Sequence, residues 1–179
     1  MEKLDCLCTK MIAYYRGEPQ QIQHFMKVHS MSAFIGRSEC LSPVQQMTLE
    51  AAAYLHDIGI KPALEQYGRC DGNLQEELGP APAREMMEAC GFDEEIIERV
   101  TFLVGHHHTY TAIDGLDYQI LVEADFLVNL YEGGSAAAAV KSAYEQIFRT
   151  AAGKWLCRTM FIPELCNGDS EPDCPVSSK

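Results

Sequence analysis

The chain has 179 residues, which is enough for one well-buried core and too few for two ordinary domains. Apolar residues make up 47% of it, as in a typical globular protein, while acidic side chains outnumber basic ones 26 to 14 for a formal charge of −12. This charge repels nucleic-acid phosphates and anionic lipid surfaces, and no run of about 18 apolar residues occurs. We therefore expect no nucleic-acid partner and no membrane partner.

Helical periodicity dominates the pattern of apolar residues. They recur at three- and four-residue steps over residues 19–37, and Ser42-Pro43 is typical of a helix start, with an N-cap followed by proline. That second helix runs to Leu55, and Gly59 follows its end. The same pattern predicts further helices over residues 80–90, 93–104, 116–131 and 136–148, and a last helical piece toward Phe161.

Two segments lack this periodicity. Residues 61–79 are polar and rich in glycine, so we expect a long loop there, and loops of this length are often functional. From Pro163 onward the chain is polar and rich in turn formers, which predicts a mobile tail over residues 163–179. Without repeats or a linker, the rest is expected to form one all-α domain, a single compact helical bundle over residues 1–162.

Cysteine usage indicates the compartment. The eight cysteines are scattered and contain no Cys-x-x-Cys pair, and the N-terminal residues lack the apolar run of a secretory signal. A chain of this length also buries a core without disulfides. We therefore expect reduced thiols and a cytoplasmic protein.

Asp125 is the first residue whose surroundings require explanation. It lies in a segment that is apolar almost all the way round, so its helix is expected in the core. A carboxylate buried there without a partner is strongly destabilised by the loss of water. Its partner is either an Arg or Lys side chain or a metal ion, unless the carboxylate reaches solvent at a helix seam.

His56 and Asp57 end an alanine-rich apolar helix, shortly before Gly59. Adjacent residues on a helix point about 100° apart, so both can bind one ion only near the helix end. An imidazole nitrogen and a carboxylate oxygen together suit zinc, iron or manganese. The alternative is a histidine that interacts with the dipole at a helix C-terminus.

His24 shares a stripe with Val28, Met31 and Ile35 at spacings of four, three and four residues. This spacing predicts that its ring lies on a buried face of the helix. A core histidine with an ordinary hydrogen-bond partner is the alternative to a metal ligand.

Three consecutive histidines, His106, His107 and His108, follow Gly105 at a predicted helix end. Successive imidazoles at such an end can reach one or two ions, while the next one contacts a substrate oxygen. The alternative for His108 is a position exposed to solvent.

The order of these residues resembles the HD superfamily of metal-dependent phosphohydrolases, in particular its small single-domain bacterial type. The resemblance covers residues 20–130 and rests on four elements: His24-x-x-x-Val28, His56-Asp57-Ile58-Gly59, His106-His107-His108 and Asp125. It implies a helical bundle that holds one or two divalent ions (Fe, Mn or Zn). The shared ligands would be His24, His56, Asp57 and Asp125, with Asp57 bridging two ions in binuclear members.

The resemblance leaves open which residues would bind a second ion. His107 lies 18 residues before Asp125, a spacing similar to that of small binuclear members, and His106 is its rival as a ligand. Binuclear members often have a further histidine before the Gly-Pro that opens the next helix, and residues 74–80 contain none. Glu76 or Glu77 could replace it as an oxygen ligand, act as a general base, or be a solvated charge.

The expected function is therefore hydrolysis of a nucleotide or another small phosphate ester by a metal-activated water. Asp57, Glu76 and Lys61 are the expected catalytic residues, and Lys61, Arg69 and His108 are expected to contact the substrate. Lys61 stands one residue later than the lysine frequent in the family, because Ile60 follows Gly59. The alternatives are a di-iron oxygenase of the same fold and a non-catalytic metal-binding module that senses a nucleotide. The apolar residues 160–162 suit a homodimer.

Overall fold

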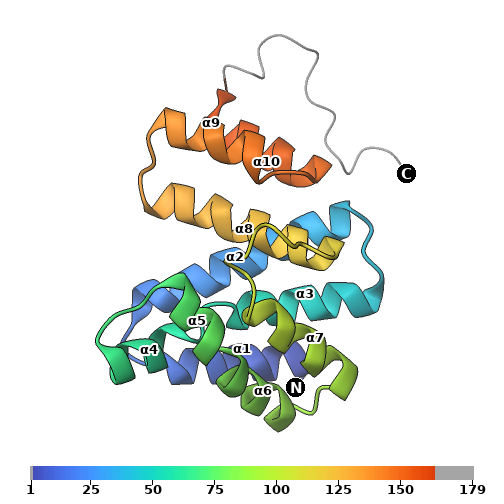
Figure 1. Ribbon diagram of the computed structural model, residues 1–179. Coiled ribbons are helices and arrows are strands. Elements are labelled where there is room, and N and C mark those ends of the chain that lie inside the picture. Colours follow the sequence, from blue (N-terminus) through green and yellow to red (C-terminus); the bar gives the residue numbers. More distant parts are fainter. Residues whose placement is uncertain (1, 164–179) are drawn as a thin grey trace.

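A computed structural model describes residues 2–163 of the protein (Figure 1). Helices and turns make up this part of the chain, without any strand, so the predicted all-α class is confirmed. The predicted mobile tail lies outside the described residues, apart from Pro163. The helices are α1 (Lys3–Tyr14), α2 (Pro19–Ser38), α3 (Pro43–Leu55), α4 (Ile60–Tyr67), α5 (Gly72–Leu78), α6 (Pro80–Ala89), α7 (Glu94–Val104), α8 (Leu116–Glu132), α9 (Ala137–Gln146) and α10 (Ala151–Phe161).

The start of α3 shows how local chemistry sets a helix boundary. The hydroxyl of Ser42 accepts a hydrogen bond from the backbone N–H of Gln45 at 3.3 Å, and the Gln45 side chain accepts one from the backbone N–H of Ser42 at 3.2 Å. This reciprocal capping box, with Pro43 as the first helical residue, satisfies donors that the helix leaves unpaired. The predicted helix start at Ser42-Pro43 is confirmed.

The long loop predicted over residues 61–79 is wrong, because this segment forms the short helices α4 and α5. Gly68 adopts a left-handed conformation (φ 64°) that ends α4, and the Asp71 carboxylate caps α5 by accepting from the backbone N–H of Leu74 at 3.2 Å. Helices of 8 and 7 residues are too short to show a clear apolar period. The glycines therefore mark turns between helices and do not indicate an extended loop.

The helices stack in layers around α2, α3 and α8 (Figure 1). Helix α2 packs along both α3 and α8, and α9 and α10 lie on one side of the molecule, where α10 packs against α8 and also contacts α2. On the other side α1 and α7 pack against α3, and α6 packs against α7. The three central helices thus bury residues far apart in the sequence against one another.

Small residues permit the close approach of the central helices. Ala51, Ala52 and Ala53 of α3 are fully buried, and leucines of α3 and α8 fill the space around them. None of the described helices has the length and apolar character that a crossing of the bilayer requires. This core brings the end of α3 close to α2 and α8.

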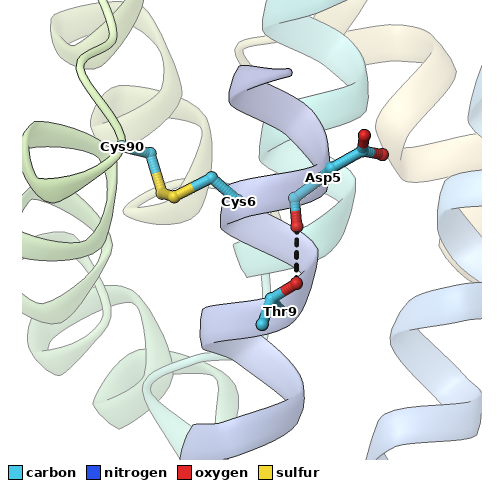
Figure 2. Close-up of a disulfide and its surroundings, with 4 residues drawn as sticks. All are labelled: Asp5, Cys6, Thr9 and Cys90. Carbon is cyan, nitrogen blue, oxygen red and sulfur yellow. Dashed lines mark hydrogen bonds between the residues drawn. A yellow bond between two sulfur atoms is a disulfide. The ribbon is translucent and has the colours of Figure 1, made fainter. Parts of the chain in front are cut away.

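A disulfide joins Cys6 of α1 to Cys90, which directly follows α6 (Figure 2). The two residues lie 84 positions apart in the sequence, and the packing of α1 against α6 brings their Cα atoms to 5.7 Å. The expectation that all thiols are reduced is wrong for this pair, because the approach of the two helices is not visible in cysteine spacing. The cytoplasmic location stays a prediction.

Replacing Cys90 with serine should lower the free energy of unfolding by about 2–4 kcal/mol, because the disulfide restricts the unfolded chain. Urea unfolding of the wild type and of Cys90→Ser, each with and without a thiol reductant, measures this. The reductant should bring the wild type to the stability of the variant and leave the variant unchanged. Equal stability of oxidised wild type and variant would contradict the prediction.

Candidate metal centre

Four helices bring histidine and aspartate side chains to one point in the core. His24 lies in the second turn of α2, Asp125 lies on α8, and His56 and Asp57 follow the last residue of α3. His107 enters from the turn after α7. These side chains are buried or nearly so, and the most exposed of them, Asp57, shows 14% of its side chain to solvent. The predicted convergence of residues 24, 56, 57 and 125 is thus present in the structure.

The first group of ligand atoms comes from His24, His56, Asp57 and Asp125. The Nε2 atoms of the two histidines are 3.1 Å apart. Oδ1 of Asp125 lies 3.3 Å from Nε2 of His24 and 3.5 Å from that of His56, and Oδ2 of Asp57 lies 3.6 Å from both. Two nitrogens and two oxygens therefore surround one small space, as expected for a divalent ion site.

The other ring nitrogen of each buried histidine has a partner that can only accept a hydrogen bond. Nδ1 of His24 lies 2.9 Å from a carboxylate oxygen of Glu132. Nδ1 of His56 lies 3.1 Å from the carbonyl oxygen of Ala53, and Nδ1 of His107 lies 2.9 Å from the carbonyl oxygen of Val104. Each Nδ1 must therefore carry the proton. The Nε2 lone pairs consequently point at one another and at the carboxylates, where only a cation or a proton stabilises them.

A second group of ligand atoms shares Asp57 with the first. Oδ1 of Asp57 lies 3.1 Å from Nε2 of His107 and 4.0 Å from Nε2 of His108. The two oxygens of Asp57 thus face different groups of nitrogens. This arrangement lets one carboxylate bridge two ions.

The carboxylates control the protonation of the first group. Burial opposes the charge of His24, but its hydrogen bond to Asp125 and the charges of Asp125 and Asp57 outweigh burial and raise the pKa of His24 to about 9. Burial likewise opposes the charge of Asp125, yet hydrogen bonds from His24 and His56 hold the pKa of this carboxyl well below its usual range. A proton on His24 thus supplies the positive charge when no ion is bound, and an ion must displace it.

Helix α1 supports the turn that carries Asp57. The phenol of the buried Tyr15 donates to the carbonyl oxygen of Asp57 at 3.1 Å and lies 3.4 Å from that of Ile58. Gly59 lets the same turn press against α5, since a Cβ atom there would stand 2.5 Å from the carbonyl oxygen of Gln75. The absence of a side chain at position 59 thus allows the close packing that places Asp57.

A second set of contacts fixes the turn that carries His107 and His108. Arg99 of α7 forms hydrogen bonds of 2.7 to 3.0 Å with the carboxylates of Asp114 and Asp117 on the far side of this turn. The phenol of Tyr118 donates to the carbonyl oxygens of His106 and Thr109. Backbone polar groups of the turn are therefore bonded, which orders the histidines.

His106 does not reach the centre, so its prediction as a rival metal ligand is wrong. Its ring stacks on Phe102 at 4.2 Å between centroids, and Nδ1 donates to the carbonyl oxygen of Phe102 at 2.7 Å. His106 is exposed, whereas His107 is buried. The predicted preference for His107 agrees with the geometry.

Two residues predicted to be catalytic have other partners. Nζ of Lys61 donates to the carbonyl oxygen of Tyr14 at 2.8 Å and lies over the ring of that residue. The carboxylate of Glu76 accepts from the backbone N–H of His108 at 2.9 Å and from the hydroxyl of Thr109 at 3.0 Å. In these contacts Lys61 holds the end of α1 and Glu76 positions the histidine turn, and their catalytic roles stay predictions.

Arg69 and His108, both predicted to contact substrate, line one cleft of about 640 Å³. His108 also belongs to the second group of ligand atoms, so this cleft adjoins the centre. Arg69 is paired with Asp71 there. The remaining lining residues are Gly72, Asn73, Leu74 and Glu77.

Three residues that support the metal-ligand cluster were not predicted from the sequence: Tyr15, Asn129 and Glu132. Asn129 donates to Oδ1 of Asp125 at 2.8 Å, and Glu132 accepts from His24. Both follow Asp125 on α8, at four and seven residues, so they lie on the same helix face. That spacing was a usable signal, whereas nothing in the sequence relates Tyr15 to the Asp57 turn.

No family model matches this chain, and no curated protein or solved structure matches it either.

Raising the pH should destabilise the metal-free protein through His24. Because its folded pKa of about 9 exceeds the ordinary 6.5, its stabilising contribution is fully present below about pH 6.5 and is lost as the pH rises through 9. Urea unfolding of the wild type and His24→Gln, both with a chelator, isolates this effect. The stability difference between them should shrink by roughly 2–3 kcal/mol between pH 6 and pH 9.5. A constant or growing difference would refute the assignment.

The adjacent residues His106 and His107 offer a matched pair of variants that tests the second group of ligand atoms, the one that shares Asp57. His107→Ala should lose one equivalent of bound manganese or zinc, because it removes a nitrogen next to Asp57. His106→Ala should keep the metal content of the wild type, since its ring lies outside the centre. Elemental analysis after dialysis gives the ions per chain, and a loss in His106→Ala with none in His107→Ala would reverse the assignment.

Proposed function

We propose that this protein is a metal-dependent phosphohydrolase of the HD type that acts on a small phosphate ester, most readily a nucleotide. One observation carries the proposal: three imidazole Nε2 atoms and two carboxylates converge in a helical core. Among the described residues, Asp57 and Asp125 form ion pairs with histidines alone, and no Lys or Arg pairs with them. A divalent ion is the cation that this set of donors fits.

The donor atoms assign residues to two ions. His24, His56 and Asp57 would hold the first, together with Asp125, whose carboxylate lies beside both histidines, and Asp57, His107 and His108 would hold the second. Mixed imidazole and carboxylate ligands suit iron, manganese or zinc. Bound divalent ions polarise a phosphoryl group and acidify a water molecule, which is the chemistry that phosphate ester hydrolysis needs.

The chain's own residues would bind and orient the ester. The cleft lined by Arg69, Asn73 and His108 adjoins the second group of ligands, so it would receive the part of the substrate attached to the phosphate. Asp71 neutralises Arg69, and Glu77 adds a negative charge to the same cleft. Side chains there offer little attraction to an anion, which agrees with the net charge of −12. Phosphate affinity should therefore depend on the ions.

Nucleotide hydrolysis tests the proposal directly. Phosphate release from a panel of nucleoside mono-, di- and triphosphates should require loading with zinc, iron or manganese, and the chelated protein should neither turn over nor bind inorganic phosphate. Asp57→Asn should lower turnover by more than about 100-fold, beyond the range of outer-shell changes. Asp93→Asn is the control, because Asp93 is exposed and pairs with Lys3 far from the centre.

The outcomes of this experiment separate the candidates. No phosphate release with any metal would refute hydrolysis. Oxygen consumption by the iron-loaded protein would instead indicate an oxygenase, and tight nucleotide binding without turnover would indicate a sensing module.

A further inference from the structure

An acidic residue contacts the side of His24 that faces away from the ligand cluster. Oε2 of Glu132 lies 2.9 Å from Nδ1 of His24, while its other oxygen accepts from Nζ of Lys27 at 3.0 Å. Nδ1 and Nε2 lie on different sides of an imidazole ring, so Glu132 contacts His24 without facing the ion site. Glu132 and Lys27 also line a cleft of about 490 Å³ together with Pro19, Gln20 and Gln23.

The position of Glu132 is electrostatically unfavourable for its own helix. It is the last residue of α8, and the last turn of that helix contains no basic residue. Carbonyl groups at a helix C-terminus disfavour a negative charge there. The contacts with His24 and Lys27 offset this cost, so the residue is better explained by its partners than by helix stability.

His24 differs from the other two buried histidines of the cluster in the group that accepts its Nδ1–H hydrogen bond. His56 and His107 donate their Nδ1–H groups to carbonyl oxygens of their own turns, whereas His24 donates to a carboxylate. A charge-assisted hydrogen bond of this kind is stronger and makes the opposite nitrogen a better electron donor. Asp125 lies seven residues before Glu132, so α8 provides both an ion ligand and the support for another ligand.

We propose that Glu132 is a positioning residue of the metal centre, which fixes His24 with its Nε2 lone pair toward the first ion and strengthens that bond. The inference rests on the proposed function only in requiring an ion at His24, and it does not require hydrolysis. Lys27 supports Glu132 by donating a hydrogen bond to its second carboxylate oxygen.

Zinc affinity, measured by competition with a chelator, gives the first readout. Glu132→Ala should weaken the first equivalent of zinc by about 10–100-fold, and Glu132→Gln, which keeps an acceptor oxygen without the charge, should weaken it less. Glu50→Gln is the matched control, because Glu50 accepts from Nε2 of His29, another histidine of α2, at 3.0 Å. That His–Glu pair lies outside the cluster, so the control should bind zinc as the wild type does.

The ring N–H resonances of the zinc-loaded protein give a second readout that a general loss of stability would not produce. His24, His56 and His107 should each show a slowly exchanging Nδ1–H signal in the wild type. In Glu132→Gln the His24 signal alone should shift, and in Glu132→Ala it should be lost to exchange, while His56 and His107 serve as internal references. Unchanged zinc affinity and an unchanged His24 signal in both variants would overturn the proposal. A wild type that binds none of zinc, iron and manganese would instead refute the proposed function.

Discussion

The removal of two carboxylates and three imidazoles from water is the constraint on which the centre depends. In the helical core these groups lose their hydration, and their Nε2 and carboxylate lone pairs converge on one space. A charge so placed is tolerated only beside an opposite charge. A proton on His24 meets this need in the metal-free protein, and a divalent ion would meet it in the metal-bound protein. The pKa of His24 and the predicted metal dependence thus have the same physical origin.

The fold provides this arrangement with backbone groups as much as with side chains. The ends of α3 and α7 supply carbonyl oxygens that bind the Nδ1–H groups of His56 and His107, so each helix end orients the histidine that follows it. Tyr15 and the bare backbone of Gly59 hold the turn between α3 and α4. Helix ends leave carbonyl groups unpaired in any case, and here these groups orient the imidazoles.

Helical periodicity was sufficient to predict the all-α class, whereas the grouping of His24, His56, Asp57 and Asp125 was predicted from the resemblance of their order to the HD superfamily. Taken singly, a histidine or aspartate on a buried helical stripe also allows an ordinary hydrogen-bond or ion-pair partner, so the pattern of one helix did not identify the group. The contacts that could not be predicted from the sequence are those that depend on tertiary packing. Lys61 bonds to Tyr14 and Glu76 to the turn after His107, although both residues stand where a catalytic role was expected. Likewise the disulfide between Cys6 and Cys90 follows from the packing of α1 against α6, which cysteine spacing does not reveal.

Anomalous diffraction from crystals grown with zinc or manganese tests the central claim most directly. We expect a peak between the side chains of His24, His56, Asp57 and Asp125, at roughly 2.0–2.3 Å from their nitrogen and oxygen atoms. A second, weaker peak should lie between Asp57 and His107. Density without an ion in this space, with the two Nε2 atoms still about as close as a hydrogen bond requires, would show that a proton is the only cation the cluster holds.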